Sequence, residues 1–167
     1  MPLDPLAKRF LDMLAAAASD SRSPSTLDER RQAFAKLMQL TRADVADVTG
    51  IDGAMPGPGG ALPYRLYAPA NDVTEYLPGF VFFHGGGMVG GTIETHDLVA
   101  AALSQTTGCR LVSVDYRLAP EHQFPAAIED AIAATEWVFE HARSLGVDAE
   151  KLVVGGDSAG ATLAAVV

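Results

Sequence analysis

The strongest constraint on the fold is a set of short, largely apolar runs that alternate with segments of helical periodicity. The runs are residues 80–83, 111–114 and 152–154. Helical patterns follow them at residues 98–103, in a long segment that Pro125 opens and Gly146 stops, and from residue 159 onward. Strands without a polar face must be covered on both sides. The sequence therefore predicts an α/β fold with a mostly parallel central sheet and helices on both faces.

Residues 1–45 predict two short amphipathic helices on either side of a break at residues 19–25. Apolar side chains recur at helical spacing before the break, at Leu6, Phe10, Met13, Leu14 and Ala17. Thr26 and Glu29 have the spacing of a capping box, in which the hydroxyl and the carboxylate each satisfy a free N–H. Two helices this short cannot enclose a core, so we expect them to lie on another part of the protein.

The periodicity changes after residue 45, where a β-hairpin is expected. Residues 45–51 and 61–68 have the pattern of strands. Residues 56–60, between them, combine prolines and glycines that favour a turn. The predicted hairpin therefore precedes the alternating strands and helices.

The composition is that of a globular domain, with 49% hydrophobic and 20% charged residues, which excludes collagen-like and disordered chains. No run approaches the ~18 apolar residues that span a bilayer. The N-terminus lacks the basic region of a secretory signal, and the single cysteine, Cys109, cannot form an internal disulfide. We expect a cytoplasmic protein with no integral membrane segment, and the sequence carries no signal for an oligomeric state.

The net charge of −9 comes entirely from residues 51–167, because the first fifty residues carry seven basic and seven acidic side chains. An acidic body without a cluster of lysines or arginines argues against nucleic-acid binding. The charge is better explained as a solvated acidic surface that keeps the protein soluble.

Residues 155–160 contain the pattern G-x-S-x-G around Ser158, between an apolar run and a helical segment. This context is typical of a nucleophile elbow, a tight turn in which the residues two before and two after the serine approach each other. Side chains at Gly156 and Gly160 would clash there. The serine would be held in a strained conformation with its hydroxyl projecting from the edge of the sheet.

The motif HGGG, residues 84–87, comes directly after the apolar run 80–83. Glycines leave backbone N–H groups unobstructed, and acyl transfer needs such donors to stabilise an oxyanion, each worth ~3 kcal/mol. A phosphate-binding loop would need Gly-Lys-Ser/Thr, which is absent. Residues 85–90 match the dinucleotide pattern G-x-G-x-x-G, but residues 91–93 look like a poor helix start. An oxyanion site is therefore the preferred interpretation.

A third motif, DYRLAPEHQFPAA at residues 115–127, joins an apolar strand to the long helix. With HGGG at 84–87 and GDSAG at 156–160, in this order and spacing, the chain resembles the hormone-sensitive-lipase-like (bacterial HSL, family IV) esterases of the α/β-hydrolase superfamily. The resemblance runs from Pro2 to Val167. It implies the α/β-hydrolase fold, with 1–45 as a helical cap segment. Residues 46–167 would be the N-terminal part of the catalytic domain, whose C-terminal half is expected outside this chain.

The resemblance also assigns roles to residues. It makes Ser158 the nucleophile, and it assigns the oxyanion hole to the N–H groups of Gly85, Gly86 and Ala159. Residues that support the motifs are His84, Gly87, Gly156, Asp157 and Gly160. The segment 115–127 would be structural. Met88 stands where many relatives have a large aromatic residue, which places it in the expected substrate pocket.

A serine nucleophile needs a histidine base oriented by a carboxylate, and in α/β-hydrolases both follow the serine in the chain. The histidines present are His84 in the glycine loop, His96 near a helix start, His122 in the structural segment and His141, expected to face solvent. Asp157 is adjacent to Ser158 and cannot be the distant orienting acid. We therefore expect the base and its partner to lie outside these residues. No cluster has the spacing of a metal site.

The resemblance implies a serine carboxylesterase that hydrolyses short- or medium-chain acyl esters through an acyl-enzyme on Ser158. Its substrate would be a small-molecule ester, and no dissociable cofactor is implied. Two alternatives remain at this stage: a ligand-binding, receptor-like member of the same fold without activity, and an inactive truncated fragment. Amidase or lactonase activity is also compatible with the motifs.

Overall fold

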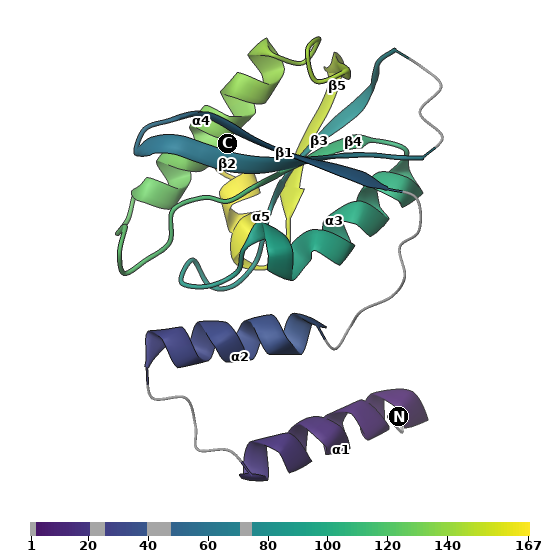
Figure 1. Cartoon of the computed structure of the whole chain (residues 1–167), viewed down its shortest axis with the longest axis vertical. Coiled ribbons are helices and arrows are strands. Elements are labelled where there is room, and N and C mark those ends of the chain that lie inside the picture. The colour runs from purple at the N-terminus through teal and green to yellow at the C-terminus, as the bar shows by residue number, and fades with distance from the viewer. Residues whose placement is uncertain (1–2, 21–25, 40–47, 71–74) are drawn as a thin grey trace. The chain divides into compact units, whose positions relative to one another are not determined.

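The computed structural model describes residues 3–20, 26–39, 48–70 and 75–167 (Figure 1). The chain divides into two compact units, Met1–Ala33 and Phe34–Val167. The second unit contains the sheet and all three motifs. The domain boundary predicted after residue 45 falls outside the described residues.

The N-terminal region forms two helices, α1 (Pro5–Asp20) and α2 (Leu27–Gln39). The predicted capping box at the start of α2 is confirmed. Glu29 N–H donates to Thr26 Oγ1 (3.2 Å), and Thr26 N–H donates to Glu29 Oε2 (3.0 Å). Helix α1 continues through the first two residues of the expected break, and residues 21–25 lie outside the described residues. On α1 the side chains of Leu6 and Met13 are exposed.

The sheet has five strands in the spatial order β1-β2-β4-β3-β5. They are β1 (Thr49–Gly57), β2 (Gly60–Ala68), β3 (Leu77–Phe83), β4 (Arg110–Val114) and β5 (Val147–Gly156). Strands β4, β3 and β5 run parallel, whereas β1 and β2 form an antiparallel hairpin whose second strand pairs antiparallel with β4. The sheet is therefore mixed, with its parallel part at the three apolar runs of the sequence.

The hairpin is present, but its first strand lies further along the chain than predicted. Residues 45–47 are outside the described residues, and β1 extends to Gly57, so the turn is confined to the two residues between β1 and β2. Pro56 lies within β1, paired with Ala61. A proline is tolerated there because β1 is at the edge of the sheet and needs no N–H on its outer side.

Helices cover both faces of the sheet, as predicted (Figure 1). Helix α3 (Ile93–Thr107) packs on one face, in a core of Tyr67, Phe82, Ala100, Ala101 and Leu111. Helices α4 (Ala126–Glu140) and α5 (Ala159–Ala164) pack on the other, in a larger core that includes Val81, Phe83, Val112, Val138 and Leu163. Alternate residues of β3 thus supply both cores.

Two helix boundaries differ from the prediction. Helix α3 starts at Ile93, because Thr92 caps it: Thr95 N–H donates to Thr92 Oγ1 (3.2 Å), and Thr92 N–H donates to Thr95 Oγ1 (2.9 Å). The expectation of a poor helix start at 91–93 was therefore wrong. Helix α4 ends at Glu140, and turns connect it to Gly146. Residues 152–154 lie on β5, which is an edge of the described sheet, and Val153 is 52% exposed.

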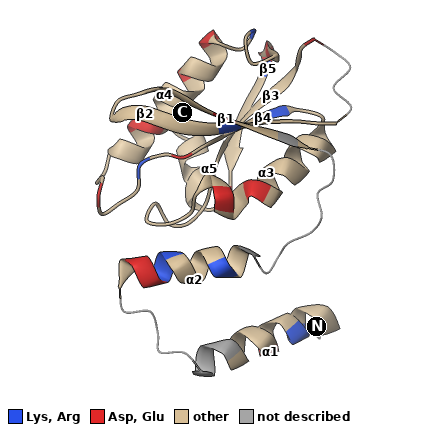
Figure 2. Cartoon of the chain, viewed as in Figure 1, with Lys and Arg blue, Asp and Glu red and all other residues tan. Residues whose placement is uncertain are grey.

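Arg65 on β2 lies among acidic side chains, two of which belong to the start of α3, where Figure 2 shows red segments. Arg65 binds the carboxylates of Asp52 and Asp97, and it lies 3.5 Å from Glu94 Oε1. Tyr67 O–H also donates to Asp97 Oδ1 (2.8 Å). Three acids therefore share one base, which leaves this part of the surface acidic, in line with the charge of the sequence.

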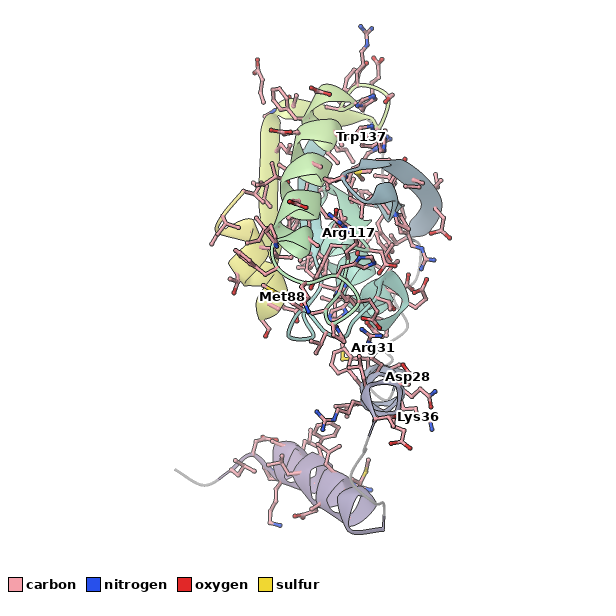
Figure 3. The ribbon with its side chains drawn as sticks, turned by 90° about the vertical axis from the view of Figure 1, so that its left-hand side faces the viewer. Asp28, Arg31, Lys36, Met88, Arg117 and Trp137 are labelled. Carbon is pink, nitrogen blue, oxygen red and sulfur yellow. The ribbon has the colours of Figure 1, made fainter. Side chains whose placement is uncertain are left out.

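The segment 115–127 connects β4 to α4 through an ion pair between a buried carboxylate and a partly exposed guanidinium. Arg117 lies beside α4 (labelled in Figure 3), and its N–H and guanidinium both donate to the carboxylate of Asp130, which is 1% exposed. Ala119 N–H donates to Met88 O (2.8 Å), which ties the same segment to the glycine loop. These bonds give the segment a structural role.

We expect Asp130→Ala to lower the free energy of unfolding of the full-length gene product by about 3 kcal/mol, because the backbone N–H and Nε–H of Arg117 lose the buried acceptor that they share. Glu129→Ala removes an exposed partner of the same guanidinium and should cost less than about 1 kcal/mol. Urea denaturation measures both values. Equal losses would contradict the special role of the buried carboxylate.

Candidate active site

Ser158 lies in the turn between β5 and α5, the strand–turn–helix context that the sequence predicts. Its backbone has φ 50° and ψ −114°, a strained conformation for a residue with a side chain. The residue is exposed. A serine held in this way presents its hydroxyl to solvent instead of to the core.

The turn is possible because two glycines let it approach the end of β3. A Cβ atom on Gly156 would lie 2.2 Å from Phe83 O and 2.7 Å from the carbonyl carbon of Gly160. A Cβ atom on Gly160 would lie 1.9 Å from Phe83 O. The two glycines approach each other as predicted, and both touch the last residue of β3.

The glycine loop, residues 84–91, follows β3 and lies beside this turn. Gly86 and Gly87 have positive φ values of 123° and 68°. The carbonyl of Gly86 accepts from Gly90 N–H (3.0 Å), and a Cβ atom on Gly86 would lie 2.2 Å from Gly90 O. The loop therefore folds back on itself, which only glycine permits at this position.

His84 and Tyr116 fix the first peptide groups of the loop. Tyr116 O–H donates to His84 O (2.6 Å). His84 Nδ1 lies 2.8 Å from Gly85 O, and because a carbonyl only accepts, Nδ1 must carry the proton. The two rings stack with their centroids 4.3 Å apart. Both side chains are buried, so the bonds are shielded from water.

Asp157 joins the loop to the turn that carries Ser158. Its Oδ1 accepts a hydrogen bond from Gly85 N–H (2.8 Å) and lies 3.4 Å from His96 Nε2. His96, in the first turn of α3, is 2% exposed, and its Nδ1 lies 2.8 Å from Thr95 Oγ1. Local sequence patterns do not predict these contacts, because Asp157 and Gly85 are 72 residues apart in the sequence.

Burial controls the charge of the groups behind the loop. Burial lowers the pKa of His84 from 6.5 to about 4, against a smaller opposing effect of its hydrogen bond to Gly85. Burial also raises the pKa of Asp115, whose Oδ1 lies 3.8 Å from His84 Nε2, and that of Tyr116. His84 and Tyr116 are therefore uncharged at neutral pH.

The N–H groups of Gly86 and Gly87 have no acceptor among the described residues, and Ala159 N–H is an unsatisfied first donor of α5. The third expected oxyanion donor, the N–H of Gly85, is not free. Gly85 N–H is occupied by Asp157, so in this structure it is not available to an oxyanion. This corrects the assignment of Gly85, and Gly87 is a free donor of the loop that the assignment left out.

The other expected site residues lie as follows. Met88, labelled in Figure 3, has φ 61°, and its side chain packs partly buried against the core beneath α4. His122 and His141 are exposed, and His141 stacks on Trp137. The structure shows no hydrogen bond between the Ser158 hydroxyl and any histidine in the part of the chain that it describes.

A helix does follow the loop, so the absence of a helix start no longer argues against dinucleotide binding at residues 85–90. The position of Asp157 argues against it instead. The carboxylate of Asp157 packs against Gly85, so that a Cβ atom there would lie 2.1 Å from Asp157 Oδ2. A fixed carboxylate at this position repels a pyrophosphate and already occupies an N–H of the loop. Across the four described ranges, no group of three or more His, Cys, Asp or Glu side chains could hold a metal ion.

A family model described as alpha/beta hydrolase fold matches residues 80–167. The chain is 41% identical to esterase LipI of Mycobacterium tuberculosis over 99% of this chain and 50% of that protein. It is 36% identical to an ethyl acetate hydrolase of Pseudomonas putida, over 99% of this chain and 54% of that one.

Solved structures of esterases are also similar to this chain over about half of their length. The structure of a hyperthermophilic esterase from the archaeon Pyrobaculum calidifontis matches with a TM-score of 0.87 and 43% identity. The match covers 99% of this chain and 52% of that one. The chain therefore spans about half the length of these relatives.

The lowered pKa of His84 predicts a pH-dependent stability. The unfolded chain protonates this histidine at its ordinary pKa, whereas the folded chain resists protonation down to about pH 4. The stabilisation is therefore complete above about pH 6.5 and lost as the pH falls to about 4, by up to about 3 kcal/mol. His84→Asn keeps a donor near Gly85 O but does not titrate. Urea denaturation of both proteins between pH 7 and 4 should show the difference shrinking, and a constant difference would contradict it.

Proposed function

The chain belongs to the alpha/beta hydrolase fold family, and we propose that the protein is a serine carboxylesterase whose nucleophile is Ser158. One observation carries the proposal. Ser158 is held at φ 50° in a strand-to-helix turn, and a hydrogen bond of 2.8 Å joins the residue before it to a glycine loop with free N–H groups. Nucleophile and oxyanion donors are the two parts that acyl transfer needs in a fixed relation.

In the proposed reaction, Ser158 Oγ attacks the carbonyl carbon of the ester while its proton passes to a base. The carbonyl oxygen becomes an oxyanion, which accepts hydrogen bonds from the N–H groups of Ala159 and Gly86. The C–O bond to the alcohol then breaks, and the alcohol leaves with a proton. Water hydrolyses the acyl-enzyme by the same steps and releases the acid.

The bond from Gly85 to Asp157 supports Gly87, in place of Gly85, as the further donor of the oxyanion hole. Gly87 is exposed, and a Cβ atom there would meet no neighbour closer than 3.9 Å, so a substrate oxygen has room to approach. The loss of one such donor typically costs about 3 kcal/mol of the barrier. His84, Gly156, Asp157 and Gly160 hold the two parts in place.

The general base is assigned to no described residue. His84 Nδ1 is bound to the loop, His96 faces Asp157, and the remaining histidines are exposed without a bond to Ser158. The proposal therefore gives this chain the nucleophile and the oxyanion donors only. Residues 1–45 are included in the proposal as a helical cap segment.

The names of the relatives support a small acyl ester as substrate. One is called an ethyl acetate hydrolase, and another, 34% identical, is an acetyl esterase from Salmonella. We include a cytoplasmic location in the proposal. No helix among the described residues is both long and apolar enough to cross a bilayer.

Ser158→Ala in the full-length gene product should lower kcat for p-nitrophenyl acetate by at least about 10⁴-fold, because no other group replaces the nucleophile. It should also abolish labelling by a fluorophosphonate. Ser144→Ala, at an exposed serine in the turn after α4, is the matched control and should behave as the wild type. Full activity or labelling in Ser158→Ala would refute the proposal.

A further inference from the structure

We propose that Asp157 is a positioning residue that holds the oxyanion loop against the nucleophile turn, and that His96 orients its carboxylate. The proposal deepens the proposed function and rests on it. It assigns a role in the reaction to two residues that neither attack the substrate nor donate to its oxygen. The role follows from three connected observations.

The first is that adjacent peptide groups of the loop are held from opposite sides. In the peptide between His84 and Gly85, the carbonyl accepts from Tyr116 O–H and the N–H donates to Asp157. In the next peptide, the Gly85 carbonyl is bound by His84 Nδ1. A trans peptide points its N–H opposite to its carbonyl, so these bonds set the direction of the free Gly86 N–H.

The second is that Asp157 belongs to the same rigid turn as Ser158. Its own carbonyl accepts from Gly160 N–H (2.8 Å), and its neighbour Gly156 is packed against Phe83 O. The backbone of Asp157 therefore moves only with the turn. Because its carboxylate also holds Gly85, one side chain fixes the distance between the nucleophile and the donor of Gly86.

The third is that His96 fixes the side chain of Asp157 without covering it. The Asp157 side chain is 50% exposed, so water alone would satisfy its charge in many orientations. His96 is buried among three rings, with its centroid 5.4 Å from that of His84, 6.1 Å from that of Phe34 and 6.4 Å from that of Phe82. Its Nδ1 contacts Thr95 in the capping box of α3. The imidazole thus offers Asp157 a fixed partner anchored on a helix.

A purely structural role makes a different prediction. A half-exposed carboxylate contributes little to stability, so its loss would leave both folding and turnover nearly unchanged. A positioning role lowers kcat while KM and the melting temperature stay close to wild type, because substrate binding in the ground state does not use the oxyanion donors.

The test uses steady-state kinetics of the full-length gene product with p-nitrophenyl acetate. Asp157→Ala should lower kcat about 100-fold, the effect of a displacement near 1 Å, with KM changed less than about threefold. Asp157→Asn keeps an oxygen that accepts from Gly85 N–H and should recover kcat to within about tenfold of wild type. Asp148→Ala, at a partly buried aspartate near the other end of β5 that pairs with Lys151, is the control and should leave kcat unchanged.

A double-mutant cycle tests the part played by His96. His96→Phe keeps the ring packing but removes the partner of Asp157, and it should lower kcat by about tenfold. In the Asp157→Ala background the same change should have no further effect, because the carboxylate that it orients is gone. Independent, additive losses would overturn the role of His96.

Wild-type kcat in Asp157→Ala, or a loss that Asp157→Asn does not recover, would overturn the role of Asp157. The Ser158→Ala variant keeps the two proposals apart. If Ser158→Ala is inactive while Asp157→Ala is unaffected, only the positioning role fails. If Ser158→Ala retains activity, the proposed function fails first.

Discussion

The candidate site depends on one close backbone contact, where the end of β3 meets the turn between β5 and α5. Cβ atoms on Gly156 and Gly160 would lie 2.2 and 1.9 Å from Phe83 O. Phe83 ends β3, and the next residue begins the glycine loop. The contact is between backbone atoms, so no side chain can relax to change the position of the loop relative to Ser158. The parallel strands β3 and β5 therefore determine the geometry of the site.

Burial turns the polar groups behind the loop into fixed partners. His84, His96 and Tyr116 are each at most 2% exposed, and an unpaired polar group there costs about 1–3 kcal/mol. His84 Nδ1 and Tyr116 O–H bind loop carbonyls, and His96 contacts a neighbouring hydroxyl and the carboxylate of Asp157, while His84 Nε2 has no hydrogen-bond partner among the described residues. Because burial lowers the pKa of His84 and raises that of Tyr116, the groups that hold the loop carbonyls are neutral dipoles at neutral pH, which salt screens little.

Local sequence patterns predicted the features that depend on residue spacing and on backbone sterics. The parallel strands, the helices on both faces, the capping box at Thr26 and the strained turn at Ser158 all follow from spacing and from glycine. The start of β1 was misplaced, because Pro56 reads as a turn until its place on an edge strand is known. The occupied N–H of Gly85 was missed for a deeper reason: its acceptor is 72 residues away, and only the sheet order brings Asp157 beside it.

That separation has a consequence for how the protein is made. Strand β3 pairs with both β4 and β5, so it is synthesised well before the second of its neighbours. The glycine loop leaves the ribosome long before the aspartate that restrains it, and polypeptides grow at about 5–20 residues per second. For several seconds the nascent chain carries an open loop and an uncovered edge of β3. Neither can close before β5 docks, since β5 is the missing neighbour of β3 and leads directly to Asp157 and Ser158.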